Sequence, residues 1–209
     1  MRVAGVDGTR GGWVAIVLEE GRFVADLLLP SVESDFAALA DADVVGIDVP
    51  IGFGPREADK RARAYLKGAA STVFSAPSRD VLVRPFGRGM GVPAQAHALG
   101  PRILHVTELA QFDNRFREVH PELSFRAMNG GDALRYRKKS AGGALERTDL
   151  LRRHGIELFE LGPSATAPLY DVLDAAAAAW SAQRVAVGSA RSLPDPPELV
   201  DGYPVAIWY

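Results

Sequence analysis

Four aspartates in this sequence have the types and positions expected of metal ligands. Asp7 closes the first apolar run of the chain, and Asp48 closes a second one. Asp171 and Asp174 are three positions apart, which places both on one face of a helix. Mg²⁺ and Mn²⁺ prefer carboxylate oxygens, and such ions orient a water and stabilise the leaving oxygen in phosphodiester hydrolysis. The pattern indicates a metal-dependent hydrolase, with Asp7, Asp48 and Asp174 as metal ligands and Asp171 as an assisting acid.

The first half of the chain predicts the strands that carry two of these acids. Residues 3–6, 13–18 and 23–29 are apolar runs joined by glycine-containing turns, a pattern typical of three antiparallel strands. The apolar run 44–47 follows a short helix that Ser31 is expected to cap, and a strand reached through a helical crossover is expected to be parallel to the first. Asp7 and Asp48 would then lie one strand spacing apart, about 4.8 Å at the backbone. Carboxylates that close repel each other unless a proton or a metal lies between them.

The rest of the chain predicts helices and two short strands. We expect helices over 55–66, 93–112, 144–154 and 169–187, a short helix from 121, and strands over 115–120 and 204–209. Pro101 should interrupt the second helix near Gly100, Thr166 should cap the last helix, and residues 188–202 read as a proline-rich loop. The predicted fold is a single α/β domain over 1–209 with a mixed five-stranded sheet flanked by helices. Residues 54–91 read as an insertion over the cleft.

Two of the acids have more than one interpretation. Glu118, on the predicted fifth strand, could be a metal ligand, a base beside the metal, or a partner for Arg115 or Arg117. Asp171 lies in the first turn of its helix, where an acid also stabilises the helix dipole. Asp174 lies deeper and precedes a run of alanines, and a face of small residues lets a helix approach a sheet closely. Asp174 is therefore the stronger candidate for a ligand.

Composition and charge limit the classes of function. The chain has 209 residues and no cysteine, which excludes disulfides and thiolate chemistry and fits a cytoplasmic location. The apolar tract 175–180 is too short to span a bilayer, so no membrane partner is expected. Residues 56–102 hold nine Lys and Arg against three Asp and Glu, and residues 113–153 hold ten against six. A basic middle with acids toward the ends suits an anionic partner laid across the middle.

The established short motifs of other enzyme classes are missing from the sequence. There is no HExxH, no zinc-ligand spacing, no Walker A loop and no GxSxG. What the sequence does contain is a set of motifs spread over nearly the whole chain. They are Gly5-Val6-Asp7-Gly8-Thr9-Arg10-Gly11-Gly12-Trp13, Ile47-Asp48-Val49-Pro50-Ile51-Gly52-Phe53, Arg56-x-x-Asp59-x-x-Ala62-Arg63, Val73-Phe74-x-x-Pro77-x-Arg79, Glu118-Val119-His120-Pro121-Glu122-x-Ser124-Phe125 and Asp171-x-x-Asp174-Ala175.

Together these motifs resemble the uncharacterised family described as predicted RNase H-like nucleases. The resemblance implies a ribonuclease H-like fold, and the paired acids of the last helix are similar to those of RuvC-type resolvases. It also implies catalytic roles for Asp7, Asp48, Glu118, Asp171 and Asp174 around Mg²⁺ or Mn²⁺. Contacts to a nucleic acid, DNA or RNA, are expected from four basic residues: Arg63, Arg79, Lys138 and Lys139.

Three functions remain open at the level of the sequence. The first is a metal-dependent nuclease or phosphodiesterase. The second is a non-catalytic module of the same fold that binds metal or nucleic acid. The third is an ATP-binding protein of the actin and sugar-kinase type, for which the chain is short and the spacing around Asp7-Gly8-Thr9 differs. The kind of phosphoester and the oligomeric state, with a homodimer as one alternative, stay open as well.

Overall fold

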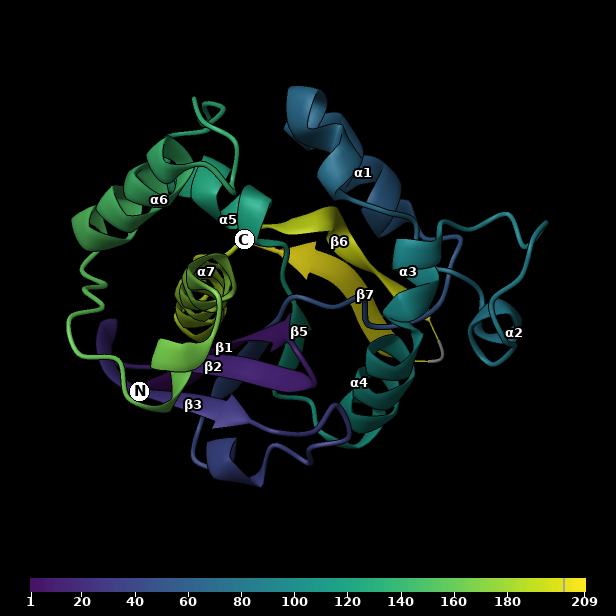
Figure 1. Cartoon of the computed structure of the whole chain (residues 1–209), viewed down its shortest axis with the longest axis horizontal. Helices are drawn as coiled ribbons and strands as arrows, with labels where there is room; N and C mark the ends of the chain where they lie inside the picture. The colour runs from purple at the N-terminus through teal and green to yellow at the C-terminus, as the bar shows by residue number, and fades with distance from the viewer. Residues whose placement is uncertain (201) are drawn as a thin grey trace.

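A mixed five-stranded sheet forms the centre of the computed structural model, which describes residues 1–200 and 202–209 (Figure 1). The strand order is β3-β2-β1-β4-β5. Strands β1, β2 and β3 are antiparallel, while β4 and β5 run parallel to β1. The sequence-based prediction of a mixed sheet is confirmed, and the strand bounds are β1 (Arg2–Thr9), β2 (Gly12–Glu19), β3 (Arg22–Leu29), β4 (Val44–Ile47) and β5 (Phe116–Glu118).

The register of the parallel strands brings their carboxyl ends to one edge. Val6 of β1 pairs with Ile47 of β4, and Ile47 in turn pairs with Glu118 of β5. The ladder continues one bond further, since the backbone amide of Asp48 donates to the carbonyl of Val6 at 2.9 Å. Asp7 and Asp48 are therefore the next residues on two adjacent strands, as the crossover argument predicts.

Helix α7 (Leu169–Ala186) lies directly on one face of the sheet, against β1, β2 and β4 (Figure 1). Its run of fully buried alanines, residues 175–179, meets two strand glycines that leave room for the helix backbone. A Cβ added at Gly5 would lie 2.0 Å from the amide nitrogen of Ala179, and one at Gly46 would lie 2.6 Å from the carbonyl oxygen of Ala178. This close approach carries the first half of α7 to the sheet edge where β1 and β4 end.

Helices cover both faces of the sheet. Val3, Val14 and Ile16 point to the core beneath α7, while Val6, Ala15 and Ile47 point to a second core that α4 covers. The alternation follows the period of two along a strand. The helices are α1 (Glu57–Leu66), α2 (Arg79–Leu82), α3 (Ala94–Ala98), α4 (Gly100–Phe112), α5 (Pro121–Met128), α6 (Ala141–Arg153) and α7 (Leu169–Ala186), with 3-10 turns η1 (Ala37–Leu39), η2 (Lys67–Thr72) and η3 (Pro163–Thr166).

The last part of the chain differs from the prediction. The stretch 188–202, predicted as a loop, contains strand β6 (Ser192–Val200), which pairs with β7 (Tyr203–Trp208) in a separate two-stranded sheet. The prolines misled the prediction because they lie where the pairing register is irregular, between Leu193 and Glu198, so their missing N–H groups cost no ladder bonds. Asp201 of the predicted loop lies outside the described residues.

Three smaller predictions had different outcomes. The helix over 93–112 divides at Leu99 into α3 and α4, and Pro101 lies in the first turn of α4, as expected. The short helix after Ser31 is only the 3-10 turn η1. Thr166 does not cap α7, since its hydroxyl donates to the carbonyl of Pro163 and Pro168 occupies the cap position. Within the described part of the chain, no helix combines the length and apolarity needed to cross a membrane.

Candidate metal centre

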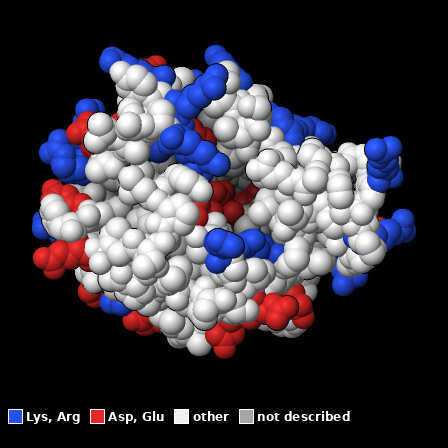
Figure 2. Space-filling model, in the orientation of Figure 1, with Lys and Arg blue, Asp and Glu red and all other residues white. Residues whose placement is uncertain are grey.

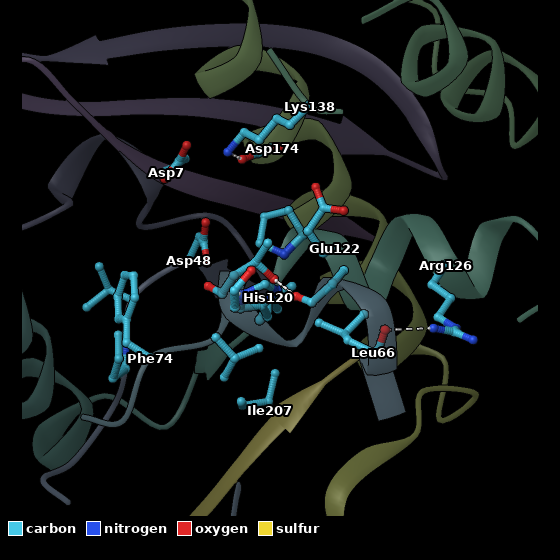
Figure 3. Close-up of a pocket in the computed structure, with 18 of the residues that line it drawn as sticks. Asp7, Asp48, Leu66, Phe74, His120, Glu122, Arg126, Lys138, Asp174 and Ile207 are labelled. Atoms are coloured by element: carbon cyan, nitrogen blue, oxygen red, sulfur yellow. Dashed lines mark hydrogen bonds and ion pairs between the residues drawn. The ribbon is translucent and has the colours of Figure 1, made fainter. Parts of the chain in front are cut away.

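Three carboxylates from β1, the end of β4 and α7 converge at the carboxyl edge of the sheet (Figure 3). Asp7, Asp48 and Asp174 each offer an oxygen, and these oxygens all lie within 4.8 Å of one another. We refer to these three residues as the acidic triad. Only 8% of Asp7 and 1% of Asp174 is exposed. Three carboxylates from three separate elements have thus been brought together and largely removed from water.

Burial makes the charges of the acidic triad costly. It raises the pKa of Asp7 well above its ordinary value, and the neighbouring charges of Asp48 and Asp174 add to the effect. Burial likewise raises the pKa of Asp48 and of Asp174 to about 7 each, although Lys138 opposes the shift in both cases. The triad therefore holds more negative charge than its surroundings balance.

Lys138 supplies the nearest positive charge. Its ammonium group forms an ion pair with Oδ2 of Asp174, and the charges of Asp174 and Asp48 raise the pKa of this lysine against the opposing effect of burial. The same ammonium lies 5.6 Å from the centre of the Tyr170 ring. Oδ1 of Asp174 is buried and has no hydrogen-bond partner among the described residues. The ammonium group of Lys138 is thus the nearest cation to all three carboxylates, and it leaves Oδ1 of Asp174 without a partner.

The triad fits a hard divalent cation by its donor chemistry. All three ligands are carboxylates, which suit Mg²⁺ and Mn²⁺ and not the softer metals that select thiolates. A buried carboxylate oxygen without a partner is uncommon in a folded protein. The free oxygen of Asp174 is therefore available as a further ligand for a cation at this position.

Asp171 lies beside the triad and outside the set of converging oxygens. It is 8% exposed, and burial raises its pKa while hydrogen bonding with Thr9 lowers it. Thr9 is the last residue of β1, so Asp171 links α7 to the strand that carries Asp7. Of the two acids on α7, the structure brings only Asp174 within reach of a metal shared with Asp7 and Asp48.

Glu118 belongs to a second group of charges at the same edge. Its carboxylate accepts hydrogen bonds from Nη2 of Arg56 at 2.9 Å and from the backbone amide of Ile51 at 2.7 Å. Arg56 also bonds Asp59, one turn along α1. We call Arg56, Asp59 and Glu118 the Arg56 cluster. The interpretation of Glu118 as a partner of Arg115 or Arg117 is wrong. Arg115 pairs with Asp113 at 2.6 Å, and Arg117 donates to backbone carbonyls.

Arg56 belongs to the segment 56–102 that the sequence shows to be basic, and nothing there predicted its burial. It is 5% exposed and lies just before α1. The charges of Glu118 and Asp59 raise its pKa, although burial alone would lower it. The spacing of Arg56 and Asp59, three positions apart, was the available signal. Its pairing with Glu118, 62 positions away, could not be read from spacing.

Most of the chain matches one family of proteins. Residues 5–199 match the family described as "Protein of unknown function (DUF429)". The chain belongs to the DUF429 family. No curated protein and no solved structure was found to match it.

In this DUF429 protein the acidic triad lines a cavity of about 1030 Å³. The Arg56 cluster and parts of segments 66–74 and 133–138 also line it. In Figure 2, Asp and Glu gather in the hollow at the middle of the face, with Lys and Arg on its rim. His120, which stands two positions after Glu118 in one of the sequence motifs, lines the cavity as well. Sequence reasoning missed three arginines of the lining, Arg102, Arg126 and Arg147, because each is an isolated basic residue on a helix.

The basic residues predicted for nucleic acid lie at different places in the DUF429 structure. Lys138 lines the cavity, whereas Lys139 lies just outside it, 5.0 Å from the centre of the Tyr170 ring. Arg63 donates to the carbonyl of Val73 and to the hydroxyl of Ser75, so it supports the segment above the cavity. Arg79 begins α2, is exposed, and is not part of the cavity lining.

Proposed function

We propose that this protein is a metal-dependent phosphodiesterase that acts on nucleic acid. The observation that carries the proposal is the acidic triad: two buried carboxylates and one half-buried carboxylate with oxygens within 4.8 Å of one another, one of them with an oxygen that has no partner. Burial of like charges is unfavourable unless a cation joins them. The order of the strands and the acid on the closing helix also agree with the ribonuclease H-like arrangement that the motifs imply.

The acidic triad would hold Mg²⁺ or Mn²⁺. Such an ion supplies Lewis acidity toward a phosphoryl oxygen and orients a water. The residues of the chain divide the remaining tasks. Asp7 and Asp48 fix the site to the sheet, Asp174 brings in the helix, and Asp171 ties the helix to Thr9. Glu118 acts as a positioning residue, because it anchors Ile51, three residues after Asp48.

The basic residues around the cavity would bind the phosphate backbone. Lys138 reaches the triad, and Lys139 and Arg137 are exposed on the same loop. Contacts of this kind carry most of the affinity for nucleic acid and position the strand without reading its bases. The surplus of Lys and Arg over residues 113–153 therefore gains a role at the mouth of the cavity.

The test is metal-stimulated cleavage with a matched pair of variants. We expect the purified protein to cut single- or double-stranded DNA or RNA in Mn²⁺ or Mg²⁺ and not in EDTA. Asp7→Asn should abolish cleavage while the circular dichroism spectrum stays native. Asp80→Asn makes the same chemical change at an exposed position on α2 and should cleave normally. Cleavage by Asp7→Asn at the normal rate would contradict the site assignment.

Metal binding is a separate measurement. We expect calorimetric titration with Mn²⁺ to show binding that Asp174→Asn removes, and a crystal soaked in Mn²⁺ to show density between the three carboxylates. Binding that raises the melting temperature without turnover on any of these substrates would favour the non-catalytic module instead. Density elsewhere, or none at high Mn²⁺ concentration, would contradict the proposed centre.

A further inference from the structure

The lining of the cavity extends beyond the acidic triad. It includes Phe74 and Arg102 as well as Arg126 and the segment 134–138. Figure 3 shows Phe74 and Arg126 well apart, with His120 between them in the view. Arg102 bonds the backbone at the end of β1 and Arg126 bonds the backbone at the end of α1, so the two arginines belong to separate parts of the lining. Two separate guanidinium groups suit a chain of phosphates better than a single phosphate.

Phe74 stands out among the side chains that line the cavity. It is half-buried, yet it belongs to none of the three hydrophobic clusters and forms no ring pair with another aromatic residue of the described chain. An aromatic ring with so much apolar area normally packs in a core. A ring that instead faces a charged cavity offers a stacking surface to a planar base, and such stacking does not depend on which base it is.

The acidic triad is largely buried, and this burial limits which form of nucleic acid can contact both the triad and the Phe74 ring. Asp174 is 1% exposed and Asp7 is 8% exposed, so the scissile phosphate must enter the cavity. At about 1030 Å³ the cavity is at the upper end of the range for small-molecule sites and takes a few nucleotides at most. The bases of a duplex are stacked and paired inside it, so they cannot turn toward Phe74 unless they are first extruded.

We propose that the substrate is an unpaired strand, which places one base on Phe74 and its phosphates over the acidic triad. This inference rests on the proposed function and names its substrate class. Arg102 is held near the triad by its bonds to the backbone carbonyls of Thr9, at 2.6 Å, and Gly12, at 3.1 Å. Arg126 is held by the carbonyls of Gly131 and Leu66. Both guanidinium groups are therefore fixed in place before a strand arrives.

The experiment measures binding without cleavage. Fluorescence anisotropy is recorded with a labelled single-stranded 12-mer of DNA or RNA and with the same label in a blunt duplex. Both are tested in EDTA and in Ca²⁺, and a gel afterwards confirms that the oligonucleotides are intact. We expect the single strand to bind at least about tenfold more tightly than the duplex. Equal binding of strand and duplex would overturn the proposal. So would binding of a mononucleotide but not the 12-mer, or binding of neither in both buffers.

Variants of Phe74 test the stacking surface. Phe74→Ala should weaken binding of the single strand about tenfold, the effect of losing one stacked base, and Phe74→Trp should retain it. Phe159→Ala is the matched control, since Phe159 is 77% exposed and not part of the cavity lining. Melting temperatures of all three variants should stay close to that of the parent. Unchanged strand binding by a folded Phe74→Ala protein would overturn the assignment.

The two proposals can fail separately. Selective binding of the single strand, lost in Phe74→Ala, with no Mn²⁺-stimulated cleavage would support the strand site and refute the nuclease. Mn²⁺-stimulated cleavage of a duplex at the same rate as a strand would support the nuclease and refute the strand site.

Discussion

Two groups of charged residues lie at the same edge of the sheet, and they differ in how completely their charged atoms are paired. In the Arg56 cluster, two carboxylates share one guanidinium, and each of its three nitrogens donates a hydrogen bond. In the acidic triad, three carboxylates share one lysine and one oxygen has no partner. Buried carboxylates are tolerated when their pairing is complete. The comparison identifies the triad as the group with carboxylate oxygens left available to a cation from outside the chain.

The largest expected effect comes from removing the cation of the Arg56 cluster, in which the pairing is complete. Arg56→Met would leave Glu118 and Asp59 buried without their cation, and we expect a loss of about 3–5 kcal/mol in the free energy of unfolding, measured by urea denaturation. A second variant tests the role of Glu118 in this loss. The double variant Arg56→Met with Glu118→Gln should recover part of the loss, because one uncompensated charge is gone. A loss below about 1 kcal/mol in the single variant would show that the cluster is not a structural unit.

The acidic triad, in which the pairing is incomplete, should make the free energy of unfolding depend on pH. Asp48 and Asp174 have a pKa of about 7 in the folded chain, above the ordinary 3.8. The native state therefore binds more protons than the unfolded state between about pH 4 and 7. Metal-free protein should lose stability as pH rises through this window, by up to about 1.4 kcal/mol per pH unit for each extra proton. The raised pKa values of Asp7 and Asp171 add to this slope, whereas burial lowers the pKa of His120 from its ordinary 6.5 and opposes the slope in the upper part of the window.

The measurement is urea denaturation in EDTA at pH 5, 6 and 7. Saturating Mg²⁺ should flatten or reverse the slope, because the ion favours the deprotonated triad. Stability that rises with pH in EDTA would contradict the charge imbalance.

Removal of one triad carboxylate should stabilise the metal-free protein. Asp7→Asn relieves repulsion from Asp48 and Asp174, and residues of functional sites commonly cost about 0.5–2 kcal/mol of stability. The thermal melt in EDTA should therefore rise in Asp7→Asn, while Mg²⁺ should no longer raise it further. An acid that only braced its turn would give the opposite sign, a loss of stability without metal.

The smallest expected effect concerns the lysine. Lys138→Met removes the cation that competes for the triad, so Mn²⁺ should bind about fivefold more tightly in calorimetric titration, the equivalent of a partly exposed ion pair. Lys139→Met is the matched control, because Lys139 is exposed and contacts the Tyr170 ring. Weaker Mn²⁺ binding in Lys138→Met would mean that the lysine supports the metal instead of competing with it.

The parts of this structure that follow local rules were predictable from the sequence. Strand runs, the crossover and the break near Pro101 each depend on a few neighbouring residues, and they placed Asp7 and Asp48 on adjacent strands. The Arg56–Glu118 pair was not predictable, because it joins residues 62 positions apart and depends on how α1 packs. The strand β6 was hidden for a different reason, since prolines normally exclude a strand unless the pairing is irregular.

The two strand glycines under α7 have a consequence for how the family can vary. Gly5 and Gly46 touch no metal ligand, yet the space they leave determines how far Asp174 stands from Asp7 and Asp48. An alanine at either position would push the helix backbone away from the sheet and widen the spacing between the carboxylates. The dimensions of the triad are thus set by missing side chains on the strands, so a change at Gly5 or Gly46 would alter the spacing of carboxylates that neither residue touches.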